Sequence, residues 1–393
     1  MKRVKVGLIG CGTISHTYMD NLTQRYKLIE VVACADMFLS KAEELAAKYG
    51  VPKACSVEEL LADPEVEIVL NLTIPVAHYE INMAALEAGK HVYCEKPLAL
   101  NLEDARKSID FAKNKGLMLG CSPDSFLGAG IQTSKKVLDN GWIGNPIAVT
   151  ANFMCHGHEL WHPAPDFYYK EGGGPMLDMG PYYITAMVAL IGPIHKITCI
   201  AKKTHDERTV LNSNIRSKKS ISVDVLTHYS GLIEFESGVI ATVNMSFDVW
   251  FSTLPKLEIY GTEGTLMVPD PNMFGGPVKL IRGDNMVDSI EGADMVEALI
   301  TINSRSKMEE FVREIPLAYH NIGYNSRGLG VLDMAYALAE GRPHRTNGDL
   351  TYHVLEALMG FERAAEEGTP YVMTSTCSKP SAVPTGLRFG ELD

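Results

Sequence analysis

The sequence predicts an α/β protein in which a parallel sheet covered by helices is followed by an α+β domain with a mainly antiparallel sheet. Up to about residue 122, short apolar runs alternate with amphipathic helical segments, which is typical of a parallel sheet covered on both faces. Beyond that point, longer alternating runs are separated by tight turns, which is typical of antiparallel strands. We therefore expect two domains, residues 1–122 and 123–393.

In the first domain the expected strands are short, apolar and rich in β-branched residues: Lys2–Ile9, Leu28–Ala35, Val66–Leu72, His91–Cys94 and Leu117–Cys121. The helices expected between them are Ile14–Gln24, Ser40–Tyr49, Pro75–Leu86 and Asn101–Asn114. Ser40 is expected to cap the second helix, and Gly50 is expected to end it. Pro75 suits the first turn of a helix.

In the second domain we expect one helix, Ile131–Asn140, before the antiparallel strands. The expected strands are Ile147–Phe153, Ser230–Phe235, Val239–Phe247, Leu257–Tyr260 and Val278–Ile281. The polar segment Lys202–Ser220 is expected to form a loop or a mobile hairpin. Apolar spacing predicts two further helices, Leu329–Glu340 and Leu350–Glu367.

Composition narrows the class of protein. The 393 residues carry a net charge of −12, which disfavours broad binding to nucleic acid or anionic membranes. No apolar run approaches the roughly 18 residues that span a bilayer, and the apolar stretch near the N-terminus is too short for a signal peptide. The eight cysteines form no C-x-x-C pair, so we expect reduced thiols in a cytoplasmic protein without a metal site.

A glycine turn follows the first expected strand. Gly10 and Gly12 fit the G-x-G-x-x-G/A pattern of dinucleotide-binding turns, with Ser15 at its last position. The next strand ends at Asp36, where a carboxylate can bind a ribose 2′-hydroxyl and repel a 2′-phosphate. The alternatives are a plain tight turn and a capping role for Asp36. We favour a site for NAD over NADP, with the turn contributing Gly10, Cys11, Gly12, Thr13 and Ile14.

Three further segments accompany this turn: NLTIP with His78, AGKHVYCEKP ending at Pro97, and GGGPMLDMG at residues 172–180. Together with the glycine turn they resemble the Gfo/Idh/MocA family of oxidoreductases over essentially the whole chain. The resemblance implies a Rossmann domain, a C-terminal domain with a large open sheet, and a homo-oligomer, dimer or tetramer, that forms through that sheet. It also implies reversible oxidation of a hydroxyl on a sugar, glycoside or cyclitol.

By the same resemblance Lys96 is the catalytic lysine and also contacts cofactor and substrate. Independently, the position of Lys96 after a strand places it at the carboxyl edge of the sheet, where open α/β sheets bind ligands. The alternative is a solvated surface lysine. The remaining expected cofactor contacts are Thr73, Pro75, His78, Glu95 and Pro123.

Asp178 and Tyr182 lie four residues apart, so they could face the same cleft from one helix. Many members of the family have histidine where this chain has Tyr182, and related members have tyrosine. We expect both residues to act in catalysis and in substrate binding, with nearby cations stabilising a Tyr182 phenolate. The alternatives are an N-cap role for Asp178 and a packing role for Tyr182, for which Tyr183 competes.

The segment CHGHELWHPAPDFYY, residues 155–169, is too rich in proline for a regular helix. We interpret it as a carbohydrate-binding loop in which Trp161 stacks on a sugar ring while His156 and His162 contact hydroxyls. A metal site formed by His156, His158 and His162 is the alternative, although their spacing matches no standard zinc site. Arg327 is a further candidate substrate contact.

Three functions fit these residues. The first is an NAD-dependent dehydrogenase acting on a secondary hydroxyl of a sugar, glycoside or cyclitol. The second is a redox-neutral glycoside hydrolase or epimerase that uses bound NAD transiently. The third is a non-catalytic NAD-binding regulator, against which the presence of Lys96, Asp178 and Tyr182 argues.

Overall fold

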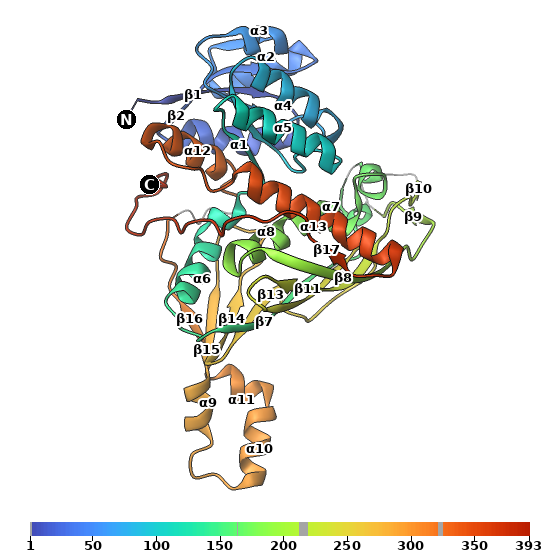
Figure 1. Cartoon of the computed structure of the whole chain (residues 1–393), viewed down its shortest axis with the longest axis vertical. Coiled ribbons are helices and arrows are strands. Elements are labelled where there is room, and N and C mark those ends of the chain that lie inside the picture. Colours follow the sequence, from blue (N-terminus) through green and yellow to red (C-terminus); the bar gives the residue numbers. More distant parts are fainter. Residues whose placement is uncertain (1, 163, 212–218, 321–324) are drawn as a thin grey trace.

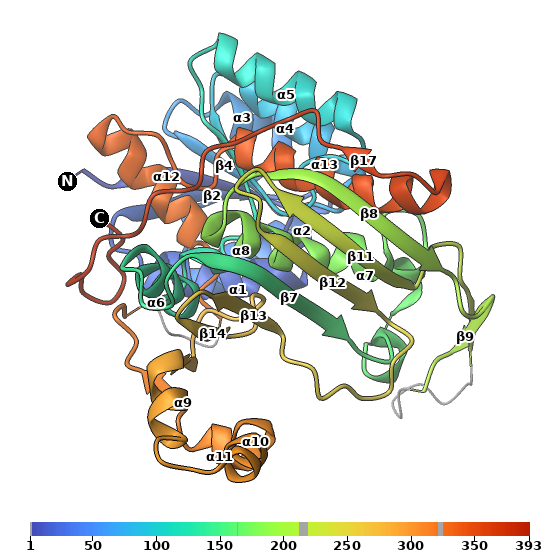
Figure 2. The same cartoon turned by 60° about the horizontal axis from the view of Figure 1, so that its bottom comes forward.

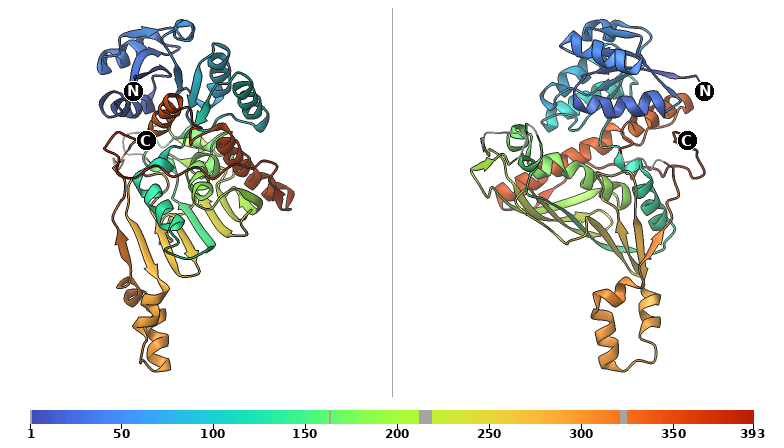
Figure 3. Two further views of the ribbon diagram at one scale, coloured as in Figure 1. Left: turned by 60° about the vertical axis from the view of Figure 1, so that its left-hand side comes forward. Right: turned by 180° about the vertical axis from the view of Figure 1, so that it is seen from behind.

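The computed structural model describes residues 2–162, 164–211, 219–320 and 325–393. They form two sheet-based domains stacked along the long axis of the molecule, with the N-terminal domain at one end (Figure 1). A narrow helical arm projects from the opposite end (Figure 3).

The N-terminal sheet consists of parallel strands in the order β3-β2-β1-β4-β5-β6. These strands are β1 (Val4–Ile9), β2 (Ile29–Ala35), β3 (Lys53–Cys55), β4 (Ile68–Asn71), β5 (His91–Cys94) and β6 (Leu119–Cys121). The order reverses between β1 and β4, and ligands of open α/β sheets bind beyond the carboxyl ends of the strands at such a point. The glycine turn after β1 and the loop after β4 therefore lie where a cofactor is expected.

Helices cover both faces of this sheet. They are α1 (Thr13–Gln24), α2 (Leu39–Tyr49), α3 (Val57–Ala62), η1 (Pro75–Ala77), α4 (His78–Glu87) and α5 (Leu102–Asn114). Gly50 ends α2 in the left-handed conformation, as predicted, with φ of 68°. The prediction that Ser40 caps α2 is wrong, because Asp36 Oδ1 accepts from the Phe38 N–H and the helix already begins at Leu39.

The second large sheet has nine strands in the order β16-β15-β14-β13-β7-β12-β11-β8-β17. They are β7 (Pro146–Met154), β8 (Ile194–Lys202), β11 (His228–Phe235), β12 (Ile240–Ser246), β13 (Leu257–Gly261), β14 (Gly264–Val268), β15 (Val278–Arg282), β16 (Arg313–Ile315) and β17 (Tyr371–Val372). Neighbouring strands are antiparallel except β7 and β12, which pair in parallel. The expected mainly antiparallel sheet is therefore confirmed. In the part of the chain that the structure describes, one of its faces carries no covering helices (Figure 2).

Outside the arm, the helices of the second domain gather on the side of its sheet that faces the N-terminal domain (Figure 1). They are η2 (Ser125–Leu127), α6 (Ala129–Asp139), η3 (His158–Leu160), η4 (Asp166–Tyr169), α7 (Gly174–Asp178), α8 (Gly180–Leu190), α12 (Leu329–Glu340) and α13 (Gly348–Glu367). Every residue of α8 is buried. Helix α13 packs against β8 and α8 on the sheet side and against α5 of the first domain. The two domains thus share one continuous packed layer at the junction.

The polar segment 202–220 was expected to form a loop or a mobile hairpin. The short strand β9 (Glu207–Thr209) in it pairs antiparallel with β10 (Ser220–Ser222), while residues 212–218 lie outside the described residues. Between β15 and β16 the chain forms the arm, α9 (Gly283–Ser289), α10 (Met295–Asn303) and α11 (Arg305–Glu309), which was not predicted. The helices of the arm bury few side chains. They therefore do not need the one-sided apolar pattern by which a core helix is predicted from sequence.

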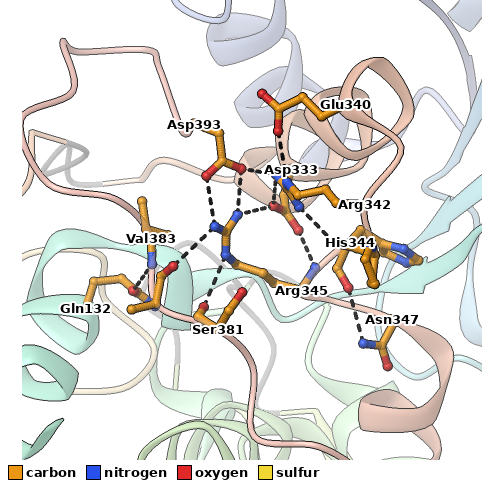
Figure 4. Close-up of polar contacts among 12 residues, drawn as sticks. Gln132, Asp333, Glu340, Arg342, His344, Arg345, Asn347, Ser381, Val383 and Asp393 are labelled. Carbon is orange, nitrogen blue, oxygen red and sulfur yellow. Dashed lines mark hydrogen bonds and ion pairs between the residues drawn. The ribbon is translucent and has the colours of Figure 1, made fainter.

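A cluster of ion pairs fixes the C-terminal segment against α12 (Figure 4). Arg345 donates to Asp333 Oδ1 (2.5 Å) and to Asp393 Oδ1 (2.9 Å), and Arg342 pairs with the same two carboxylates. The Ser381 carbonyl accepts a further bond from Arg345. Because Asp333 is fully buried, these arginines compensate a charge that would otherwise be costly.

Among the described residues, no helix combines the length and the apolar character that crossing a membrane requires.

Candidate active site

The glycine turn has the shape that a dinucleotide pyrophosphate requires. Gly10 has φ of 99°, and a Cβ there would lie 2.6 Å from the Leu72 backbone, so only glycine fits. A Cβ at Gly12 would meet nothing within 4 Å, which leaves open space over the N-terminus of α1. Free backbone N–H groups at such a terminus attract phosphate oxygens. The residues present therefore fit the cofactor that the motif predicts.

Asp36 is held at this turn. Its Oδ2 accepts from the Cys11 N–H (2.8 Å) and its Oδ1 accepts from the Phe38 N–H (2.9 Å). The carboxylate is half-buried at the end of β2, beside the start of α1 at Thr13 and Ile14. It lies where the sequence pattern predicts a contact with the adenosine ribose.

The other expected cofactor residues line the carboxyl edge of the sheet. Thr73 donates through N and Oγ1 to Asn71 Oδ1 (3.1 and 2.7 Å), which fixes the loop after β4, and Pro75 is exposed on that loop. Glu95 accepts from Tyr18 Oη (2.7 Å) and from the Lys96 N–H (2.9 Å).

Two of the expected cofactor residues lie deeper. Pro123 is buried after β6. His78 is also buried, and both of its ring nitrogens contact chain carbonyls. His78 therefore has no ring nitrogen left for a cofactor.

Lys96 and Asp178 come together across the two domains. Lys96 Nζ donates to the Asp178 carbonyl oxygen (2.8 Å) and to Asp178 Oδ1 (2.9 Å). His158 Nε2 lies 2.9 Å from Asp178 Oδ2, so one carboxylate joins the lysine and the histidine. The side chains of Lys96 and Asp178 are each 16% exposed, which keeps the pair accessible yet poorly solvated.

Charge pairing dominates the electrostatics of this site. Burial disfavours the Lys96 ammonium, but the adjacent Asp178 carboxylate more than offsets this and raises the lysine pKa above its usual value. Burial likewise disfavours ionisation of Asp178, but Lys96 and His158 lower its pKa to about 2. Near neutral pH, Lys96 is therefore an ammonium group and Asp178 a carboxylate.

Tyr182 faces the same lysine. Lys96 Nζ lies 5.5 Å from the centre of the Tyr182 ring, and Arg327 Nη2 donates to Tyr182 Oη (3.1 Å). Asp178 ends α7 and Tyr182 lies on the separate helix α8, because the helix breaks at Met179 before Pro181. The structure thus brings together the three expected catalytic residues and also Arg327. Tyr182 is 8% exposed, so it packs and also offers its hydroxyl to the site.

The glycine run before Asp178 lies very close to the backbone of two other segments. A Cβ at Gly173 would lie 2.6 Å from the Tyr168 carbonyl oxygen. Gly174 has φ of 81°, and a Cβ there would lie 2.9 Å from the Leu226 carbonyl oxygen. The run therefore lets the start of α7 lie directly against η4 and against the backbone at Leu226.

The three histidines of the loop at residues 155–169 contact different partners. His156 stacks on Trp250, with ring centres 3.4 Å apart, and His162 contacts Trp161 (5.3 Å). Only His158 among the three reaches Asp178. Sequence reasoning did not assign His158 to the catalytic group.

The turn at Gly157 separates His158 from His156. Gly157 has φ of 95°, which turns the chain between His156 and His158 and aims the two rings at different partners. The next residue, Glu159, is buried and paired with Arg208 (2.7 Å), which anchors the loop.

Trp161 is 60% exposed and lies 5.2 Å from the His158 ring, so it forms an accessible aromatic face near the catalytic group. Among the described residues, no group of three or more His, Cys, Asp or Glu side chains is arranged to hold a metal ion. The His158 ring is committed to Asp178 instead.

Comparison with known proteins places this site in a family. Residues 4–122 match an oxidoreductase family described by its NAD-binding Rossmann fold, and residues 131–267 match the GFO/IDH/MocA C-terminal domain. The 1,5-anhydro-D-fructose reductase of Ensifer adhaerens is 30% identical over 272 residues, which are 66% of this chain and 74% of that protein. Myo-inositol 2-dehydrogenase of Thermotoga maritima is 26% identical over 269 residues, 67% of this chain and 74% of that protein.

Among solved structures, levoglucosan dehydrogenase in complex with NADH has a TM-score of 0.77 at 20% identity, covering 95% of this chain and 100% of that one. The fold and the matched domains define an NAD-binding oxidoreductase. More particularly, the chain belongs to the Gfo/Idh/MocA family, which confirms the resemblance drawn from its motifs.

Proposed function

We propose that this protein is an NAD-dependent dehydrogenase that interconverts a secondary hydroxyl and a ketone on a sugar, glycoside or cyclitol. The observation that carries the proposal is the cluster of Lys96, Asp178, His158, Tyr182 and Arg327 at the carboxyl edge of the NAD-type sheet. Relatives named as a myo-inositol dehydrogenase and an anhydrofructose reductase support this substrate class.

Lys96 orients and polarises the substrate oxygen. An ammonium group has three N–H donors, and two of them bond Asp178 in the described structure, which leaves one for the substrate. The raised pKa of Lys96 keeps it charged, so it stabilises an alkoxide rather than accepting its proton.

Tyr182 handles the hydroxyl proton. Arg327 Nη2, 3.1 Å from Tyr182 Oη, and the nearby Lys96 both stabilise negative charge on the phenol oxygen. During oxidation Tyr182 Oη takes the substrate O–H proton, and during reduction it returns this proton. His158 holds Asp178, and Asp178 holds Lys96, so both are positioning groups for the ammonium.

NAD, when bound, supplies the acceptor for the hydride that leaves the substrate carbon. The chain would hold it with the glycine turn at Gly10 and Gly12, with Asp36 at the ribose, and with the loops that carry Thr73 and Glu95. A carboxylate at Asp36 favours NAD over NADP, because a 2′-phosphate would meet like charge.

The loop between β7 and α7 contributes residues that bind the substrate. Trp161 presents an exposed ring on which a sugar face can stack, and His162 lies beside it. His156 stacks on Trp250 instead and belongs to an outer part of the same surface. We assign the inner hydroxyl contacts to Tyr182 and Arg327.

The uncovered sheet face suits self-association. Ile200, Leu232 and Ile240 all point outward from it, and each is at least half exposed. A dimer or tetramer would cover these side chains. The eight free thiols suit a cytoplasmic location.

A screen for NADH formation over free sugars, glycosides and inositols tests the proposal. We expect NADH and a ketone to accumulate together for at least one substrate class. A parallel product analysis distinguishes the alternatives: cleavage or epimerisation without NADH indicates a redox-neutral enzyme, and NAD binding without turnover indicates a regulator.

A further inference from the structure

His78 occupies an unusual position beneath the candidate active site. It is the first residue of α4, and its side chain is 1% exposed. Its Nδ1 lies 2.6 Å from the Pro97 carbonyl oxygen, and its Nε2 lies 3.0 Å from the Thr73 carbonyl oxygen. The ring thus spans the gap between the loop after β4 and the loop after β5.

Both partners of this ring are hydrogen-bond acceptors. A backbone carbonyl has no proton to donate, so each of the two bonds requires an N–H on the imidazole. Neutral histidine has only one such N–H, whereas the imidazolium has two. Hydrogen bonds to both carbonyls therefore need the imidazolium form of His78.

The two loops have separate roles in the site. Thr73 lies on the loop beside the glycine turn, and Pro97 follows Lys96 directly. A shift of either loop would move the ammonium group relative to the cofactor cleft. We propose that His78 is a positioning residue that acts as a buried imidazolium, clamping the Thr73 and Pro97 loops and so fixing Lys96. The role in catalysis rests on the proposed function, whereas the charge and the clamp do not.

A counter-charge is available next to the ring. Cys94, at the end of β5, lies beside His78 and is fully buried, as is Cys121 on the neighbouring strand. Burial opposes a charge on His78, but Cys94 and the two carbonyls raise its pKa to about 9. Burial also opposes ionisation of Cys94, while Cys121 and His78 lower the pKa of its thiol. These neighbours favour a proton on the His78 ring rather than on the Cys94 sulfur.

The chain offers a matched control on the same sheet. His91 begins β5, at the edge opposite Lys96, and is partly buried. Its Nδ1 accepts from the Met118 N–H (2.9 Å), so this ring nitrogen carries no proton. Burial lowers the pKa of His91. His91 is therefore expected to be a neutral imidazole that is remote from the cofactor edge.

Nitrogen NMR of the full chain labelled with ¹⁵N-histidine tests the charge without any substrate. At pH 7 we expect both His78 nitrogens to show matching protonated shifts, whereas His91 shows one protonated and one unprotonated nitrogen. The His78→Gln and His91→Gln variants assign the signals. An unprotonated nitrogen on His78 would overturn the proposal.

Kinetics of the same two variants test the clamp. We expect His78→Gln to lower kcat by about 10- to 100-fold with a smaller change in substrate KM, because misplacement of a reacting group by about 1 Å costs up to that much. His91→Gln should retain near-normal kcat. Equal kinetics for the two variants would refute the positioning role. If the wild-type enzyme oxidised no sugar or cyclitol, the proposed function would fail, while the NMR spectrum would still decide the charge of His78.

Discussion

Replacement of Tyr182 by phenylalanine removes one oxygen atom from the candidate site and leaves the ring in its packed position. Two groups lose a partner: Arg327 Nη2, which lies 3.1 Å from this oxygen, and the substrate hydroxyl that it is proposed to serve. A lost proton acceptor typically costs 10²–10⁴-fold in turnover, which corresponds to about 3–5 kcal/mol in the barrier. Arg327 Nη1 keeps its bond to Asn325 Oδ1 (2.8 Å), and the loss of the partner of Nη2 should cost about 1–2 kcal/mol of unfolding free energy.

The assay is steady-state turnover over a range of pH, together with NAD titration and thermal unfolding. We expect Tyr182→Phe to lose most turnover and to bind NAD normally. Tyr183→Phe is the matched control, because Tyr183 is the next residue, is fully buried and bonds Asp270 instead (3.2 Å). Near-normal turnover in Tyr182→Phe would mean that Tyr182 only packs and that Lys96 alone manages the proton.

Three further predictions use the same readouts. Lys96→Met should keep NAD affinity, because the expected nucleotide contacts are the glycine turn and Asp36, but should lower turnover by about 10²–10⁴-fold; wild-type turnover would remove Lys96 from the mechanism. Paired titrations should show tighter binding of NAD than of NADP, and Asp36→Asn should narrow the difference; equal binding by the unchanged protein would remove the role assigned to Asp36. Extensive treatment with a chelator should leave activity intact, and elemental analysis should find no stoichiometric transition metal; a tightly bound metal on the loop containing His158 would revive the metal-site interpretation.

The parts of the fold that depend on local pattern were predictable. Short apolar runs alternating with helical segments predicted most strands of the first sheet, and α12 was predicted with its observed bounds, Leu329–Glu340. Strand β3 was missed because its three residues, Lys53–Cys55, do not form an apolar run. The parallel pairing of β7 with β12 joins strands far apart in the chain, and no local signal encodes it.

In the site, too, local sequence pattern predicted some features, whereas contacts between distant parts of the chain were not predictable. The position of Lys96 after a strand predicted the sheet edge, but its bond to Asp178 spans 82 positions of the chain and depends on the packing of two domains. His158 could not be chosen from three nearby histidines by spacing alone. His78 was expected to touch the cofactor, and only the positions of the Thr73 and Pro97 carbonyls show how both of its nitrogens are used.

Transfer of an isotope label tests the central proposal, hydride transfer between a substrate carbon and NAD, most directly. A substrate found by the screen, deuterated at the carbon that carries the reacting hydroxyl, is mixed with the enzyme and NAD, and the NADH and the product are isolated. The proposed function predicts that the label appears in NADH in an amount equal to the ketone formed, and that Lys96→Met transfers far less. A product that forms while its carbon keeps the deuterium, with no label in NADH, would contradict the proposed reaction.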